Sequence, residues 1–264
     1  MRAVTADRML AVFAHPDDES IVAGGTLAAC AAAGVEVLVL CATRGEQGPI
    51  ADPEMASRAT LGTVREQELL AACQALGTRA ECLGFSDGTL DSVEAEVATQ
   101  VASRIHRWRP RVVLTFGPDG LYGHPDHVAV YRATMAALDK LGDGDVRPWA
   151  YQATWPEGRM VQLVAALAER GLPADLWGLA PEEFGAPPSS ITTVVDVRAF
   201  LAPKLRALRC HRTQLTPDHL FRVLPDDLAE EFLGREYFVR ARPLDAARDW
   251  LTGVVSAPAA QGVS

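Results

Sequence analysis

Three short apolar runs stand out in the first half of the chain, and each of them ends in a cluster of polar residues. They are residues 9–14 (MLAVFA), 35–42 (VEVLVLCA) and 111–116 (RVVLTF). These runs are rich in Val and Leu and show no clear alternation of apolar and polar positions, which is typical of strands buried in a parallel sheet. We therefore predict three parallel strands at these positions.

Helical patterns fill the intervals between and after these runs. The predicted helices cover residues 20–33, 58–76, 92–108 and 125–141. An apolar residue recurs every four positions from Val93 to Ile105, and Gly34 and Gly77 follow the first two segments as C-terminal caps. Strands that alternate with helices predict an α/β fold with right-handed crossovers. We expect a Rossmann-like, mostly parallel sheet flanked by helices.

The second half of the chain has a weaker pattern. Residues 142–190 are rich in Pro and Gly, and we predict that they form an insertion or a lid. Three later segments are expected to return to the core as a strand, a helix and a strand, at 191–195, 199–211 and 236–240. We predict one domain over residues 1–252, followed by a disordered tail at 253–264.

Composition and charge exclude several classes of protein. The 264 residues are 48% hydrophobic and 22% charged, which fits a soluble globular protein. A net charge of −9 argues against nucleic acid as a partner. The five cysteines contain no C-x-x-C pair, no apolar stretch is long enough to span a membrane, and the N-terminus lacks a signal peptide. We predict a cytoplasmic protein without a membrane or nucleic-acid partner.

Two of the polar clusters are rich in metal-binding residue types. His15-Pro16-Asp17-Asp18-Glu19 follows the first predicted strand, and Tyr122-Gly123-His124-Pro125-Asp126-His127 follows the third. In open α/β sheets, ligands bind beyond the carboxyl ends of the strands, so we expect the two clusters to converge in space.

The spacing within both clusters suits a metal ion. His15 and Asp18 are three residues apart at a turn, and His124 and His127 have the same spacing at the start of a helix. Two histidines and one carboxylate, with one position left for water, form a typical catalytic zinc site. Each motif alone is equally consistent with a turn and its capping carboxylate. Three of the six histidines fall within the two motifs, which favours the metal site.

The sequence resembles the PIG-L or LmbE-like superfamily of zinc-dependent N-deacetylases. The motifs that carry the resemblance are AHPDDE, TRGEQG and YGHPDH, in this order along residues 8–140. Weaker similarity continues at His211-Arg212-Thr213-Gln214 and at Arg235-Glu236-Tyr237-Phe238. The resemblance is specific for the superfamily and much less specific for the substrate.

The resemblance assigns metal-binding and catalytic roles to named residues. It implies that His15, Asp18 and His127 bind the metal, either zinc or ferrous iron. It also implies that Asp17 is the general base, which takes a proton from the zinc-activated water. Zinc lowers the pKa of bound water to about 7, which is consistent with hydrolysis at neutral pH.

Three further residues receive roles by the same resemblance. His124 is expected to be charged and to stabilise the tetrahedral intermediate or the leaving amine, and Asp126 is expected to orient it. An acid is needed because an amide nitrogen leaves only after protonation. Tyr122 is expected to polarise the amide carbonyl, and its alternative role is that of a half-buried loop aromatic.

Further polar residues are candidates for substrate binding, each with a structural alternative. Arg44 and Glu46 contact substrate or brace the metal site, or they form a loop ion pair. Arg58 and Arg65 either meet an anionic substrate group or lie on a solvated helix face, and the pattern favours the solvated face for both. Asp87 binds sugar hydroxyls or makes a turn. His211 is either part of the pocket wall or a core histidine.

We therefore predict a zinc-dependent amidohydrolase that removes an acetyl or related acyl group from a glucosamine-containing small molecule, an N-acylated amino sugar. One alternative is an amidase of the mycothiol-conjugate type. A second is a non-catalytic, sugar-binding Rossmann-like module, which the intact motifs and the missing G-x-G-x-x-G loop disfavour. The sequence leaves the oligomeric state open, with a homo-oligomer among the alternatives.

Overall fold

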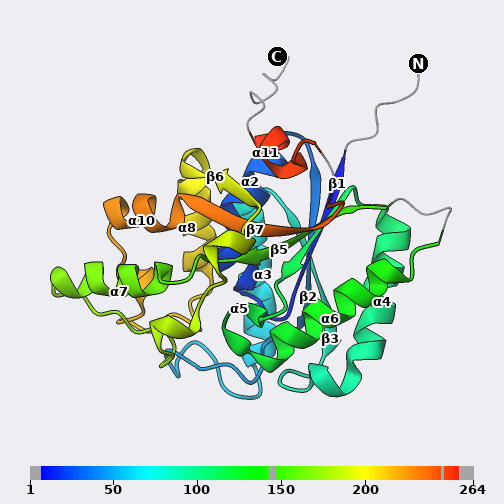
Figure 1. Cartoon of the computed structure of the whole chain (residues 1–264). Coiled ribbons are helices and arrows are strands. Elements are labelled where there is room, and N and C mark those ends of the chain that lie inside the picture. The colour runs from blue at the N-terminus through cyan, green and yellow to red at the C-terminus, as the bar shows by residue number, and fades with distance from the viewer. Residues whose placement is uncertain (1–6, 143–146, 245–246, 256–264) are drawn as a thin grey trace, which may run out of the picture.

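The computed structural model describes residues 7–142, 147–244 and 247–255, and a seven-stranded sheet runs through its centre (Figure 1). The strand order is β3-β2-β1-β4-β5-β7-β6. The strands are β1 (Arg8–Phe13), β2 (Glu36–Thr43), β3 (Arg79–Phe85), β4 (Val112–Phe116), β5 (Trp149–Thr154), β6 (Thr193–Asp196) and β7 (Arg235–Arg242). Strands β1 to β5 pair in parallel, whereas β7 pairs antiparallel with both β5 and β6. The prediction of a mostly parallel, Rossmann-like sheet is confirmed.

The helices form a layer on each face of the sheet. Helices α4 and α6 pack together on one face, and α2, α3 and α8 pack together on the other (Figure 1). The α-helices are α1 (Asp18–Val22), α2 (Gly24–Ala32), α3 (Leu61–Leu76), α4 (Glu94–Trp108), α5 (Gly120–Gly123), α6 (Pro125–Asp139), α7 (Arg159–Glu169), α8 (Leu201–Cys210), α9 (Leu220–Val223), α10 (Asp226–Leu233) and α11 (Trp250–Val255). Four short 3₁₀ helices are η1 (Leu90–Val93), η2 (Pro181–Glu183), η3 (Pro188–Ser190) and η4 (Arg198–Phe200).

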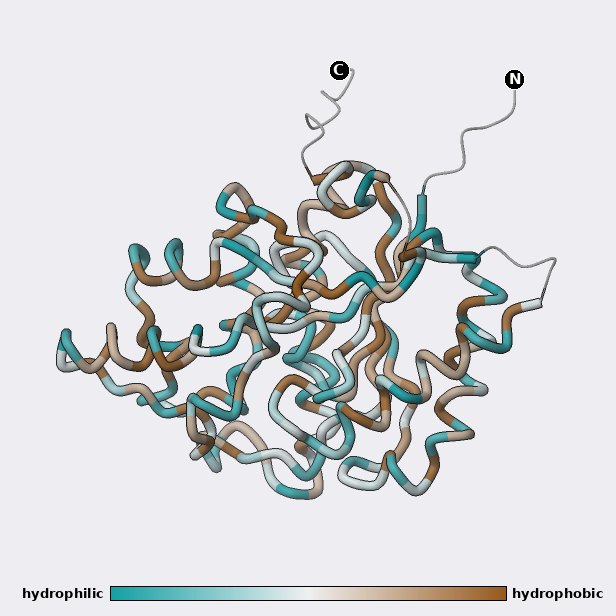
Figure 2. Tube along the Cα trace, in the orientation of Figure 1, coloured by the Kyte–Doolittle hydropathy of each residue, from teal (hydrophilic) through white to brown (hydrophobic). Residues whose placement is uncertain are grey.

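Apolar residues of the central strands form the core. Strands β1 and β4 are almost wholly buried, and Figure 2 shows apolar residues concentrated along the middle of the sheet. Among the described residues, no helix is long and apolar enough to cross a membrane.

The first predicted helix, over residues 20–33, is divided in the structure. The chain leaves helical geometry at Ala23, where φ is −142°, and resumes as α2. A Cβ atom at Gly25 would overlap the side chain of Val197, so the glycine allows α2 to lie against this residue. The carboxylate of Glu236 accepts hydrogen bonds from the backbone N–H groups of Gly25 and Thr26. The break thus gives α2 its own N-terminus, which Glu236 caps.

Two strands were absent from the prediction. Strand β3 lies at the edge of the sheet and is only half-buried, so it lacks a continuous apolar run. Strand β5 is buried, but it carries the polar residues Gln152 and Thr154. Because β5 falls within 142–190, part of the range predicted as an insertion belongs to the sheet. In the predicted tail, residues 253–255 end helix α11, and residues 256–264 lie outside the described residues.

Candidate active site

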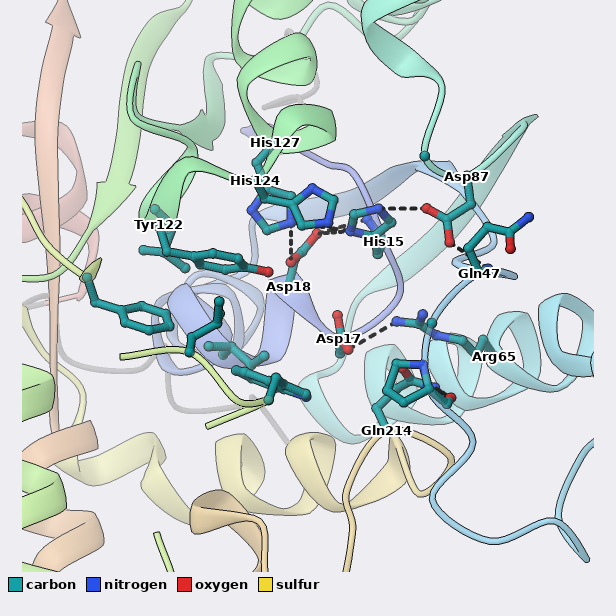
Figure 3. A pocket seen from close by; sticks show the side chains of 18 of the residues that line it. His15, Asp17, Asp18, Gln47, Arg65, Asp87, Tyr122, His124, His127 and Gln214 are labelled. Carbon is teal, nitrogen blue, oxygen red and sulfur yellow. Dashed lines mark hydrogen bonds and ion pairs between the residues drawn. The ribbon is translucent and has the colours of Figure 1, made fainter. Parts of the chain in front are cut away.

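The polar clusters converge at the carboxyl edge of the sheet, around a cavity of about 350 Å³ (Figure 3). The turn after β1 and the segment between β4 and α6 supply most of the titratable side chains. The loops after β2 and β3 complete the polar part of the wall. Segments more than 100 residues apart in sequence therefore form one site, as the sequence analysis expected.

Two histidines and one carboxylate meet inside this cavity. Nδ1 of His15 lies 3.2 Å from Nε2 of His127. The carboxylate oxygens of Asp18 lie 3.7 Å from Nδ1 of His15 and 3.3 Å from Nε2 of His127. All three residues are buried, and their ligand atoms are close enough to share one ion.

The other ring nitrogens of these histidines already have partners. Nδ1 of His127 lies 3.0 Å from the carbonyl oxygen of Gly120, to which it donates. Nε2 of His15 lies 3.0 Å from Asp87 and 3.3 Å from Asp126, and it donates to these carboxylates. Such outer contacts fix the tautomer of a metal-binding histidine, so one nitrogen of each ring faces the other ring.

The facing nitrogens suit a tetrahedral metal ion. Two nitrogens that each lie about 2.0–2.1 Å from a tetrahedral zinc ion are separated by about 3.3 Å. In the absence of a cation, the pKa of His15 is raised to about 10. Burial lowers this pKa, but hydrogen bonds to Asp126 and Asp87 and the charge of Asp18 outweigh burial. Burial and the charge of His15 hold the pKa of His127 well below its usual range. The donor set therefore attracts a positive charge, and a metal ion fits it.

Asp126 orients His15 rather than His124. Its carboxylate accepts hydrogen bonds from the N–H groups of Gly88 at 2.7 Å and Leu90 at 3.1 Å, besides its contact with His15. Only the backbone N–H of Asp126 contacts His124, by donating to Nδ1 at 3.2 Å. The predicted contact between the Asp126 carboxylate and His124 is thus replaced by a contact with His15, a candidate metal ligand.

Asp17 lies next to the candidate metal ligands in an unusual backbone conformation, with φ at 124°. Its backbone N–H donates to Glu19 at 3.0 Å, and its carboxylate lies 3.0 Å from Nη2 of Arg65. Burial raises the pKa of Asp17, and the charge of Arg65 partly offsets this effect. Strained residues of this kind persist where their surroundings over-determine them, often at active sites.

Arg65 is buried, so the interpretation of a solvated helix face is wrong for this residue. Its guanidinium also donates to the carbonyl oxygens of Pro16 at 2.5 Å and Gly45 at 2.7 Å. A Cβ atom at Gly45 would overlap this guanidinium, and φ at Gly45 is +64°. The glycine of the TRGEQG motif therefore makes room for Arg65.

A second buried ion pair lies behind Asp17. Nε2 of His211 lies 2.8 Å from Oε1 of Glu19, and the hydroxyl of Ser20 donates to the same oxygen at 2.5 Å. Burial alone would lower the pKa of His211, but the charge of Glu19 raises it above its usual value. Because Glu19 also holds the N–H of Asp17, the pair supports the candidate base. His211 is therefore a buried structural partner and does not line the cavity.

His124 and Tyr122 line the cavity on the side of α6. Nδ1 of His124 accepts a backbone hydrogen bond, which leaves Nε2 available to the cavity. Burial, followed by the charge of His15, lowers the pKa of His124, which favours the neutral ring, contrary to the expectation that His124 is charged. Burial and the charges of Asp18 and Asp17 raise the pKa of Tyr122, whose hydroxyl points toward Asp18 in Figure 3. Tyr122 therefore keeps its proton and can donate a hydrogen bond.

With this geometry established, comparisons with known proteins identify the family. The family model described as GlcNAc-PI de-N-acetylase, PIG-L, matches residues 10–138. The chain is 36% identical to a 1D-myo-inositol 2-acetamido-2-deoxy-alpha-D-glucopyranoside deacetylase of Acidothermus cellulolyticus, over 89% of this chain and 88% of the relative. This chain belongs to the PIG-L family. It is an enzyme of the deacetylase type.

Solved structures of other proteins have a similar fold. A conserved protein of Thermus thermophilus has 27% sequence identity and a TM-score of 0.58, over 89% of this chain and 95% of that protein. The N,N'-diacetylchitobiose deacetylase of Pyrococcus horikoshii shares the fold, with 22% identity and a TM-score of 0.60 over 89% of this chain and 83% of that one.

Of the four predicted substrate-binding residues, only Asp87 lines the cavity. Arg44 is exposed and pairs with Glu66 at 2.6 Å. Arg58 donates to the carbonyl oxygens of Glu46 at 2.7 Å and Gly48 at 2.9 Å. The carboxylate of Glu46 accepts the N–H of Asp87 at 2.9 Å. The TRGEQG loop of this PIG-L protein is thus held by contacts with Arg58, Glu66 and Asp87, and its Gln47 and Gly48 reach the cavity instead.

Two further parts of the cavity wall come from outside the clusters at residues 15–19 and 122–127. Gln214 lines the cavity and donates to the carbonyl oxygen of Pro49 at 3.0 Å. The sequence signal for Gln214 was its place in the segment His211–Gln214, which is weakly similar to the PIG-L superfamily. An apolar wall comes from the range predicted as an insertion or lid, and its residues are Trp155, Trp177, Leu179 and Phe184.

Proposed function

We propose that this protein removes an acetyl or related acyl group from the 2-amino group of a glucosamine-containing small molecule, with a Zn²⁺ ion as its cofactor. Membership in the PIG-L family and the similarity to a deacetylase of an inositol glycoside of N-acetylglucosamine support the substrate class. The observation that carries the proposal is the meeting of His15, Asp18 and His127 beside Asp17.

His15, Asp18 and His127 would hold the ion, and their two nitrogens and one carboxylate oxygen suit zinc, with ferrous iron as the alternative. When bound, the ion would polarise the amide carbonyl and lower the pKa of a water molecule to about 7.

Asp17 takes the proton from the attacking water in this proposal. Its raised pKa makes it a stronger base than an exposed carboxylate, while Arg65 favours its ionised form. The hydrogen bond from its N–H to Glu19 holds the backbone in place, so the carboxylate is positioned before substrate binds.

Tyr122 and His124 act on the substrate amide. The hydroxyl of Tyr122 remains protonated and donates to the negative charge that develops on the carbonyl oxygen. His124 presents Nε2 to the departing amine, because its other ring nitrogen is held by the backbone of Asp126. Asp87 remains our candidate for binding a sugar hydroxyl, since it lines the cavity.

The direct test is the release of primary amine from methyl N-acetylglucosaminide and related glycosides, with and without a metal chelator. We expect a chelator to abolish hydrolysis and added Zn²⁺ to restore it. His127→Gln should lose both bound metal and activity, whereas His106→Gln, on the outer face of α4, should retain both. Hydrolysis that persists in a preparation free of metal would contradict the proposal.

A further inference from the structure

The active-site cavity has two chemically different parts. The part next to Asp17 is lined by titratable and amide side chains, including Asp87, Arg65 and Gln214. The part formed by residues 155–184 presents Trp155, Trp177, Leu179 and Phe184, without a charged or amide side chain from that range of the described chain. A substrate that fills the cavity must therefore match a polar and an apolar surface.

Aromatic contacts hold the buried part of the apolar surface in place. The ring of Phe184 lies 5.0 Å from that of Tyr122 and 5.7 Å from that of Trp155, measured between centroids. Trp155 and Phe184 are buried, so they support the wall from behind. Aromatic contacts at these separations stabilise a fixed arrangement of the rings.

Trp177 is held in place by its neighbours. Its φ is +53°, a left-handed conformation that is uncommon for a bulky residue. Its ring lies 4.4 Å from the ring of His219 and 5.9 Å from that of Phe221. Trp177 and Leu179 are both half-buried, so each keeps apolar surface exposed to the cavity.

This surface discriminates between kinds of substrate group. A hydroxyl-rich ring pressed against it would lose hydrogen bonds to water without gaining partners from the wall, which is unfavourable. An aryl or alkyl group would gain binding free energy in proportion to the apolar area that it buries. The wall therefore favours an apolar group over a polyol.

We infer that the substrate carries an aryl or alkyl group that packs against Trp177 and Leu179 while the amide lies at Asp17. The inference rests on the proposed deacetylation and specifies its substrate class. The apolar group belongs either to the aglycone or to the acyl chain. Both sources would present the same apolar chemistry to the wall, and an experiment that varies each group separately distinguishes them.

The experiment compares kcat/KM in two substrate series. The first varies the aglycone of N-acetylglucosamine through methyl, octyl, phenyl and myo-inositol, and the second varies the acyl group of methyl glucosaminide through acetyl, hexanoyl and benzoyl. We expect an apolar member of one series to exceed the methyl N-acetyl reference by about tenfold or more. Equal rates across both series, or a preference for the inositol glycoside, would overturn the inference. If the proposed function itself fails, no member of either series is hydrolysed. Hydrolysis of the methyl N-acetyl reference without a preference for an apolar member would contradict this inference alone.

A variant tests whether the wall causes the preference. Leu179→Gln should lower the ratio of kcat/KM for the preferred apolar substrate to that for the reference by about fivefold. Leu70→Gln, on the exposed side of α3, is the matched control and should leave the ratio unchanged. An unchanged ratio in a folded Leu179→Gln protein would show that this wall does not select the substrate.

Discussion

Nη2 of Arg65 lies 3.0 Å from Oδ2 of Asp17, and only 4% and 15% of the two side chains are exposed. The pair connects helix α3 with the turn after β1, where the candidate base lies. We expect Arg65→Gln to lower kcat/KM by about 10²-fold, because misplacement of a catalytic group carries a cost of this size. Arg65→Lys should restore part of the activity, since it retains the charge.

The pH dependence of kcat/KM distinguishes an effect of Arg65 on the base Asp17 from a merely structural role of Arg65. Arg65 lowers the pKa of Asp17, so its removal should raise that pKa further. A general base must be ionised, and the acidic limb of kcat/KM should therefore move to higher pH in Arg65→Gln. An acidic limb at the same pH as in the wild type would contradict the assigned pairing.

Asp126 contacts His15, a candidate metal ligand, at 3.3 Å. Asp126→Asn should weaken metal affinity by about 10–100-fold, as is usual for the outer partners of metal-binding histidines. Competition with a chromogenic chelator measures the affinity. Asp91→Asn, at an exposed site in η1, is the matched control. Equal metal affinities in both variants would show that Asp126 does not act on His15.

His219 makes the stability of the fold depend on pH. Burial lowers its pKa from 6.5 to about 4, and its Nδ1 accepts the N–H of Phe221. The unfolded chain therefore binds more protons between these pH values, so stability is full above pH 6.5 and falls as the pH drops toward 4. The loss contributed by His219 should reach about 3 kcal/mol near pH 4.

Urea unfolding of His219→Asn between pH 4 and 7 tests this prediction. Asparagine keeps an acceptor for the N–H of Phe221 but does not titrate in this range. The difference in unfolding free energy between wild type and variant should therefore shrink toward pH 4. Parallel pH dependence in the two proteins would mean that His219 is not the responsible group.

The buried pair of Lys204 and Glu236 stabilises the packing of α2 and α8 on the sheet. Nζ of Lys204 lies 2.7 Å from Oε1 of Glu236, and both side chains are almost fully buried. Lys204→Met should lower the unfolding free energy by about 3–5 kcal/mol, because it leaves the carboxylate buried without its partner. Arg170→Met, which breaks an exposed pair with Asp227, should change stability little. Similar losses in the two variants would contradict this account.

The central part of the fold and the candidate metal site could be predicted from the sequence because their signals are local. Buried parallel strands appear as short apolar runs, and His15, Asp18 and His127 lie within two compact motifs. The similarity at 235–238 is explained by Glu236, which caps α2 and pairs with Lys204. These features depend on residue type and spacing, which a sequence displays directly.

The remaining parts depend on how distant segments meet. Arg65 is buried because carbonyl oxygens of two loops surround its guanidinium, and an isolated helix pattern cannot reveal such acceptors. Asp126 approaches His15 rather than His124 because the loop after β3 supplies the N–H groups of Gly88 and Leu90. Trp177 lies in a segment without regular periodicity, so the sequence did not show which side chains of this segment reach the cavity wall.

The central claim is that Asp17 acts as the base beside a metal held by His15, Asp18 and His127. The most direct test measures bound metal and amine release on the same preparations of wild type and Asp17→Asn. The account predicts equal metal content and a loss of about 10²–10⁴-fold in kcat for the variant, the usual contribution of a general base. An Asp17→Asn protein that binds metal and hydrolyses the substrate at the wild-type rate would contradict it.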